Sequence, residues 1–193
     1  MNIGVKEVRR HMKTISVIVP CYNEEKALPF FLQEVRSVLE RMMEDEELAY
    51  ELLFINDGST DGTLQLLRDA ARQDNHVQYL SFSRNFGKEA AMYAGLQHCK
   101  GDYAAVMDAD MQDPPSLLPE MYAALRSGEY DSVATRRVSR DGEPPVRSFF
   151  ARRFYRLMNR ISDTRIEDGA RDFRLMTRQM VDAILSMTEY NRF

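Results

Sequence analysis

The sequence predicts an α/β protein with a mainly parallel central sheet flanked by helices. Short apolar runs alternate along the chain with longer segments in which apolar residues recur every three or four positions. The short runs show little alternation between apolar and polar residues, which is expected when helices cover both faces of a sheet. Repeated strand–helix–strand units favour parallel strands joined by right-handed connections.

The expected elements begin after a polar N-terminal arm, residues 1–13. The first helix has a clear apolar stripe, which includes Leu28, Phe31 and Leu32. We expect strands at 15–20, 51–56, 77–81, 103–107 and 130–135, and helices at 26–43, 60–72, 88–98, 115–127, 146–161 and near 178–188.

Composition narrows the class of protein. A chain of 193 residues with 44% apolar and 29% charged residues fits one globular domain. The net charge of −4 argues against a nucleic-acid partner held by general attraction. The two cysteines lack metal-site spacing, so a reduced, cytoplasmic setting is expected. We find no secretory signal, and no apolar run approaches the roughly 18–20 residues that span a bilayer.

The positive charge is unevenly distributed. Residues 136–174 contain eleven Arg, no Lys and six acids, which gives this segment a local charge of about +5. Such a segment can face phosphate or an anionic membrane, and it can equally be a solvated helix face. The sequence leaves both interpretations open.

A pair of carboxylates follows the fourth expected strand. Asp108 and Asp110 lie two positions apart, and Gln112, Asp113 and two prolines come next. If the strand continued through them, both carboxylates would share one face. Two convergent carboxylates suit a hard divalent cation and leave positions open for diphosphate oxygens. The alternative is that these acids only occupy a turn, which Asp and Pro favour.

Polar segments also follow the first three expected strands, at residues 20–25, 56–63 and 83–88. In open α/β sheets, ligands bind beyond the C-terminal ends of the strands. Four polar loops at one edge therefore predict a single site.

Each residue in these loops has a binding and a structural interpretation. Asp57 can accept hydrogen bonds from a base or ribose, and Tyr22 can stack on a base or pack locally. Glu24 can bind a ribose or favour the start of the first helix. Gly87 and Lys88 suit a phosphate at a helix start, although Gly87 can be needed only for its backbone angles.

The sequence argues against other known ligand-binding motifs, and it predicts a structural role for one pair of polar residues. Residues 57–62 open like a calcium-binding loop, but position twelve is Arg68 rather than Glu. Ser59 or Thr60 is expected to cap the next helix. The glycine patterns of dinucleotide-binding and P-loop proteins are missing from the sequence.

Four stretches together resemble family 2 glycosyltransferases of the GT-A fold. They are Val-Ile-Val-Pro-Cys-Tyr-Asn-Glu-Glu, Asn-Asp-Gly-Ser-Thr-Asp-Gly-Thr, Ser-Arg-Asn-Phe-Gly-Lys and Met-Asp-Ala-Asp-Met-Gln-Asp-Pro-Pro. The chain is most similar to the dolichol-phosphate mannose synthase and bactoprenol glucosyltransferase group. The resemblance implies a catalytic domain over residues 14–193, and we expect it to be truncated at its C-terminus because that group usually continues further.

The resemblance also implies site residues. Mg²⁺ or Mn²⁺ would bind Asp108, Asp110 and Gln112, and the catalytic residues would be Asp110 and Asp172, with Asp172 near the acceptor. A UDP- or GDP-hexose donor would contact Pro20, Tyr22, Glu24, Asp57, Gly87, Lys88 and Asp108, with Arg174 meeting phosphate. Asn56 departs from the family pattern, in which Asp is frequent.

The implied activity is inverting, metal-dependent transfer of a hexose to a polyprenyl phosphate. The alternatives are transfer to a saccharide hydroxyl in cell-surface polysaccharide synthesis, and a nucleotide-sugar-binding module without turnover. The implied location is cytoplasmic, at the inner face of the cytoplasmic membrane, with the Arg-rich segment touching anionic lipid. No nucleic-acid partner is expected, and assembly into a homo-oligomer is left open.

Overall fold

The computed structural model describes residues 12–46, 48–136 and 170–187. The expected helix at 146–161, most of the Arg-rich segment and most of the N-terminal arm lie outside these residues. The strands are β1 (Thr14–Cys21), β2 (Ala49–Asn56), β3 (Val77–Ser81), β4 (Tyr103–Val106), β5 (Ser132–Arg136) and β6 (Ala170–Thr177). The helices are α1 (Leu28–Glu46), α2 (Thr63–Gln73), α3 (Lys88–His98), α4 (Leu118–Arg126) after the short 3-10 helix η1 (Pro115–Leu117), and α6 (Arg178–Ser186).

The described strands form one mixed sheet in the order β3-β2-β1-β4-β6-β5. β1 pairs in parallel with β2 on one side and with β4 on the other, and β3 extends the parallel part beyond β2. β6 is antiparallel to both β4 and β5. The predicted α/β class with a mainly parallel sheet is therefore confirmed.

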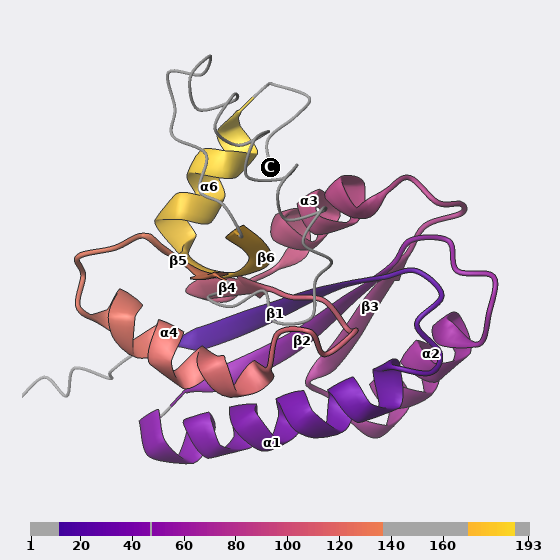
Figure 1. Ribbon diagram of the computed structural model, residues 1–193, viewed down its shortest axis with the longest axis horizontal. Coiled ribbons are helices and arrows are strands. Elements are labelled where there is room, and N and C mark those ends of the chain that lie inside the picture. Colours follow the sequence, from indigo (N-terminus) through magenta and orange to yellow (C-terminus); the bar gives the residue numbers. More distant parts are fainter. Residues whose placement is uncertain (1–11, 47, 137–169, 188–193) are drawn as a thin grey trace, which may run out of the picture.

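Helices cover both faces of this sheet (Figure 1). One face packs against α1, α2 and α4, in a core that includes Val17, Leu52 and Phe54. The other packs against α3 and α6, in a core that includes Ile18, Leu53 and Ile55. Consecutive residues of β1 and β2 thus enter different cores, which is why these strands are apolar throughout.

Helix α1 buries the stripe that its sequence predicted. Leu28, Phe31, Leu32, Val35, Val38, Leu39 and Met42 are all buried. Phe31 meets Phe54 of β2 edge-on, with ring centroids 6.1 Å apart. Each large apolar side chain on this stripe stabilises the fold by about 1.5–3 kcal/mol.

Strand β6 was not among the predicted elements. Its residues alternate in direction: Phe173 and Leu175 enter the core beneath α1 and α4, whereas Met176 enters the core beneath α3 and α6. Asp172 and Arg174 lie on the same face as Met176. Charged residues interrupt the apolar ones, and the pairing partners of β6 lie far away in the sequence, so this segment gave no clear strand signal.

Helix α3 lies unusually close to β1. A Cβ atom added to Gly95 would lie 2.2 Å from Cγ2 of Ile18, so only glycine fits between this helix and the strand. The helix is therefore held close against the sheet. Its first residue, Lys88, projects from the end at which β1 and β2 finish.

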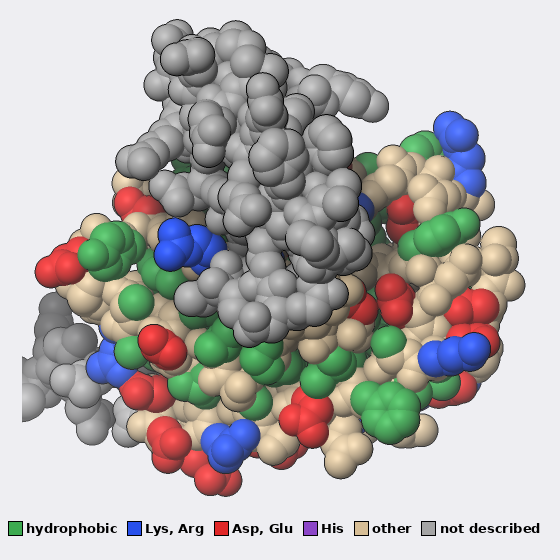
Figure 2. Space-filling model, in the orientation of Figure 1, with side chains coloured by type: hydrophobic (Ala, Val, Ile, Leu, Met, Phe, Trp, Pro, Cys, Tyr) green, Lys and Arg blue, Asp and Glu red, His purple; other side chains and the backbone are tan. Residues whose placement is uncertain are grey.

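On the face that Figure 2 shows, acidic and basic side chains are intermixed among the described residues. Among these same residues, no helix is both long and apolar enough to cross a membrane. Cys21 and Cys99 are buried and unpaired.

We predict that Gly58→Ala lowers the free energy of unfolding by about 2–4 kcal/mol, measured by urea denaturation. Gly58 has φ of 66°, and an added Cβ would lie 2.3 Å from the carbonyl carbon of Arg84. Gly128→Ala is the control, because Gly128 has φ of 76° and open space around it. It should cost only about 1 kcal/mol. Equal losses for the two variants would contradict the close approach at Gly58.

Candidate functional site

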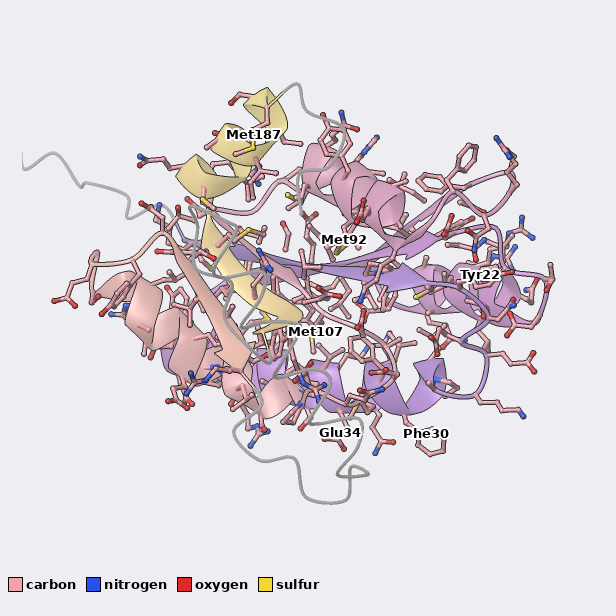
Figure 3. The ribbon with its side chains drawn as sticks, turned by 45° about the horizontal axis from the view of Figure 1, so that its top comes forward. Tyr22, Phe30, Glu34, Met92, Met107 and Met187 are labelled. Carbon is pink, nitrogen blue, oxygen red and sulfur yellow. The ribbon has the colours of Figure 1, made fainter. Side chains whose placement is uncertain are left out.

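A cavity of about 290 Å³ lies at the C-terminal edge of the parallel strands. The end of β1 and the loops after β1 and β2 contribute Pro20, Tyr22, Glu24 and Asp57, which the family resemblance assigned to the donor. Figure 3 shows Tyr22 beyond the end of the sheet, and this side chain is exposed. The site residues predicted from the first two loops therefore lie together.

The loops after β3 and β4 complete the same cavity. They contribute Gly87, Lys88, Asp108 and Asp110, which the sequence assigned to phosphate and metal. Gln112, Asp172 and Arg174 were also predicted, but they do not line this cavity. Thus four loops converge as expected, although the binding role of each side chain remains a prediction.

The loop after β1 is held by the loop after β2. The backbone N–H of Glu24 donates to Oγ1 of Thr63 at 2.8 Å, and the N–H of Thr60 donates to Oδ1 of Asn23 at 2.8 Å. The N–H of Gly62 donates to a carboxylate oxygen of Glu25, also at 2.8 Å. These bonds run in both directions, so the two loops form one rigid unit.

This arrangement corrects the expected cap of the second helix. Helix α2 begins at Thr63 with Gly62 at its cap position, and no side chain caps it there. The hydroxyl of Ser59 instead accepts from the N–H of Asn23 at 3.0 Å. The capping prediction for Ser59 or Thr60 is wrong, because these residues join the two loops rather than starting the helix.

Asp57 is the buried anchor of the next loop. One of its carboxylate oxygens accepts from the N–H of Phe86 at 2.7 Å, and the other accepts from the N–H of Gly87 at 2.9 Å. The residue is only 3% exposed. Asp57 thus fixes the start of α3, while each oxygen keeps a second lone pair toward its surroundings.

Gly87 precedes helix α3 with φ of 96°, a conformation that favours glycine. A Cβ atom added there would meet nothing within 4 Å. The backbone angle, rather than close packing, therefore explains glycine at this position, as the structural interpretation of the sequence proposed.

Asp108 and Asp110 converge by a different route from the one predicted. Strand β4 ends at Val106, so strand alternation does not place these two side chains. The chain turns instead, with Met111 at φ of 60°, and Oδ1 of Asp110 accepts from the N–H of Gln112 at 3.0 Å. Both carboxylates still line the cavity.

Lys88 links two carboxylates that come from different parts of the chain. Its Nζ lies 2.7 Å from a carboxylate oxygen of Asp108 and 2.5 Å from Oδ2 of Asp172 on β6. Burial alone would lower the pKa of Lys88, but hydrogen bonds to these carboxylates and their charges outweigh it and raise this pKa. Lys88 is therefore a firmly charged ammonium at the edge of the cavity.

Negative charge accumulates around Glu24. Burial raises the pKa of this carboxyl above its ordinary value of 4.5, and the charges of Asp110, Asp108 and Asp61 add to the effect. The cavity therefore has an unfavourable excess of negative charge, which a cation would relieve.

Gln112 does not line the cavity. Arg171 of β6 donates to Oδ2 of Asp113 at 3.2 Å and lies 3.4 Å from Oε1 of Gln112. Arg171 thus holds the turn that carries Asp110, a role that the sequence did not reveal. Its only signal was its place in the block with Asp172.

Asp172 and Arg174 border a second, smaller hollow of about 40 Å³, together with Met92 and Val106. Met92 lies on α3, near which Figure 3 labels it. The hollow adjoins the main cavity through Asp172, which contacts Lys88. Asp172, which was predicted to lie near the acceptor, therefore lies beside residues that were predicted to bind the donor.

Asn85 and Cys21 also line the main cavity, although they were not among the predicted site residues. Asn85 stands in the predicted loop two residues before the candidate Gly87, which was the available signal. Asn56 does not line the cavity. Its amide donates to Oγ of Ser81 at 2.9 Å and its oxygen accepts from the N–H of Ser59, so it joins β2 to its neighbours.

The cavity suits a divalent cation only in part. Asp108 and Asp110 offer hard oxygen ligands and a local excess of negative charge. Among the described residues, however, no group of three His, Cys, Asp or Glu side chains could hold a metal. The donor set fits a cation whose remaining ligands come from a bound phosphate or water.

Comparison with known proteins identifies the relatives. The family described as Glycosyl transferase family 2 matches residues 16–185. A prophage bactoprenol glucosyl transferase homolog of Escherichia coli K12 is 42% identical over 182 residues, which are 93% of this chain and 57% of that protein. The bactoprenol glucosyl transferase of Shigella phage SfV is 40% identical over 179 residues, again 93% and 57%. The chain thus spans a little over half the length of these curated relatives.

The fold is also found in solved structures. A mannosyltransferase of Pyrobaculum calidifontis, solved with GDP-Man and Mn²⁺, superposes with a TM-score of 0.62 at 20% identity. The match covers 91% of this chain and 47% of the other. This likeness confirms the predicted GT-A fold.

We predict that Glu24→Gln raises the melting temperature near neutral pH, in the presence of a chelator. Because the pKa of Glu24 is raised, the folded state holds this proton more tightly than the unfolded state, and stability falls as pH rises above about 4.5. The variant lacks this loss, so its advantage should shrink as the pH falls toward that value.

Glu25→Gln is the matched control, because it removes the same charge one residue further along. Its carboxylate accepts a hydrogen bond from Gly62, so no gain is expected. A Glu24→Gln variant that is no more stable than the unchanged protein near neutral pH would contradict the repulsion described above.

Proposed function

Because the chain belongs to glycosyltransferase family 2, we propose that it carries the catalytic site of an inverting, metal-dependent hexosyltransferase. The donor would be a UDP- or GDP-sugar and the acceptor a polyprenyl phosphate. The observation that supports this most directly is the convergence of four loops on one cavity, which brings Lys88 beside Asp108 and Asp110.

The choice of acceptor rests on the relatives. Two proteins at 40–42% identity are named for bactoprenol glucosyl transfer, and bactoprenol is a polyprenyl lipid carrier. Within this chain, the hollow beside Asp172 contains Arg174, a cation suited to phosphate. A lipid acceptor would bring the protein to the membrane surface, at the cytoplasmic face where nucleotide sugars are available.

The proposed reaction breaks the bond between the sugar and the diphosphate, so negative charge develops on the leaving group. Asp108 and Asp110 would hold Mg²⁺ or Mn²⁺, whose charge offsets that of the diphosphate. Lys88, together with the backbone N–H groups at the start of α3, would add positive potential at the same place. Attack by the acceptor on the opposite face of the sugar would invert the anomeric centre.

Asp172 would act on the acceptor, and its position beside Lys88 and Arg174 supports this role. A phosphate acceptor is already ionised near neutral pH, so Asp172 would only orient it through Lys88 and Arg174. A saccharide hydroxyl, in contrast, would need Asp172 to remove its proton. The two acceptor classes therefore make different demands on the same residue.

We predict that Asp110→Ala weakens Mn²⁺-dependent binding of UDP or GDP by roughly tenfold or more, measured by calorimetry. Asp110 is exposed, and its side chain bonds only the N–H of Gln112 among the described residues, so the fold should survive. Glu44→Ala removes one exposed acid from the far end of α1 and should leave binding unchanged. Equal, metal-independent nucleotide binding by the Asp110→Ala variant would exclude the proposed role of the cation.

We predict that labelled hexose from UDP- or GDP-hexose appears on polyprenyl phosphate and that Asp172→Asn reduces this rate by about tenfold or less. For a hydroxyl acceptor, loss of a general base would reduce the rate by about 10²–10⁴-fold. Thin-layer separation of lipid and saccharide products measures both outcomes. Product on saccharide alone would establish the polysaccharide alternative, and no turnover with any donor would favour a binding module.

A further inference from the structure

We infer that Lys88 is an internal counter-ion that competes with the divalent cation for Asp108 and transfers to the diphosphate when the donor binds. This inference rests on the proposed function, since it concerns the same cation and donor. It assigns Lys88 a second task, which is to make cation binding depend on the nucleotide.

The geometry supports competition at Asp108. The ammonium of Lys88 lies 2.7 Å from a carboxylate oxygen of Asp108, which is the position of a charged hydrogen-bond partner. A divalent cation bound to the same carboxylate would lie about 2.0–2.6 Å from its oxygens. Two positive groups at such distances from one carboxylate repel each other, so the cation gains Asp108 fully only when Lys88 moves.

The Lys88 side chain can move, and a second carboxylate can hold it after it moves. Its side chain is 39% exposed and has four flexible methylene groups, so the ammonium can shift without a change in the backbone. Oδ2 of Asp172, 2.5 Å away on β6, keeps a partner for Lys88 after it leaves Asp108. Lys88 can therefore release one carboxylate while it remains bound to the other.

The charge of the cavity explains why the nucleotide would trigger the exchange. Of the described residues that line it, four are acidic, namely Glu24, Asp57, Asp108 and Asp110, and Lys88 is the one cation. A diphosphate brings new oxygen ligands for the divalent cation and for Lys88 at once. Coupling between two ligands is reciprocal, so the nucleotide should tighten cation binding by the same factor as the cation tightens nucleotide binding.

The test is a titration with Mn²⁺ in which electron paramagnetic resonance measures the free ion, without nucleotide and with saturating UDP or GDP. We expect Lys88→Met to bind Mn²⁺ roughly three- to tenfold more tightly than the unchanged protein when nucleotide is absent. The ratio of Mn²⁺ affinity with nucleotide to that without should fall by a similar factor.

Two variants control for other effects. Lys88→Arg keeps the charge and should keep weak Mn²⁺ binding in the absence of nucleotide. Lys100→Met removes an exposed lysine at the opposite end of the sheet and should also leave Mn²⁺ affinity unchanged. Thermal melting of each variant confirms that it is folded.

Unchanged or weaker Mn²⁺ binding by a folded Lys88→Met variant would overturn the inference while leaving the proposed function intact. An equal gain in Lys88→Arg or Lys100→Met would also overturn it, because the gain would then not depend on the charge at this position. If neither the unchanged protein nor any variant bound Mn²⁺ with nucleotide, the proposed function would fail, and this inference with it.

Discussion

The parallel pairing of β1 with both β2 and β4 determines where the candidate site residues that follow these three strands lie. Cys21 is opposite Asn56, and Ile18 is opposite Val106, so the three strands end within a short distance of one another. Their loops must then emerge at one edge of the sheet. The acidic groups gathered there come from segments more than 80 residues apart, and only this register brings them together.

Hydrogen bonds between the loops convert this edge into a defined cavity. Asp57 orders the start of α3 through two backbone N–H groups, and the polar residues at 59–63 fix the loop after β1. Each bond satisfies a backbone N–H group in a loop between a strand and the next helix. The motif around Asp57 is therefore largely a framework, and the side chains that face the cavity are those the framework leaves available, such as Tyr22, Glu24 and Asp110.

Sequence patterns predicted the parts of the fold that depend on local order. The stripe on α1 and the apolar runs of β1 and β2 identified their elements because burial follows the helical or extended period directly. The convergence of the loops followed from the parallel topology. The features that were not predicted depend on residues far apart in the sequence. Strand β6 pairs with β4 and β5, and Arg171 donates to Asp113, 58 residues earlier in the sequence. The turn at Asp108–Asp110 was misjudged because the strand stops at Val106, before the two acids.

The contact between Gly95 and Ile18 makes the geometry of the site depend on two residues that do not line the cavity. Helix α3 rests directly on β1 there, two turns or about 10 Å from Lys88. A bulkier residue at either position would tilt or lift the helix, and its N-terminal ammonium would move with it. Apolar substitutions in the core, at residues that do not line the cavity, can therefore change the electrostatic potential of the site in this member of the family.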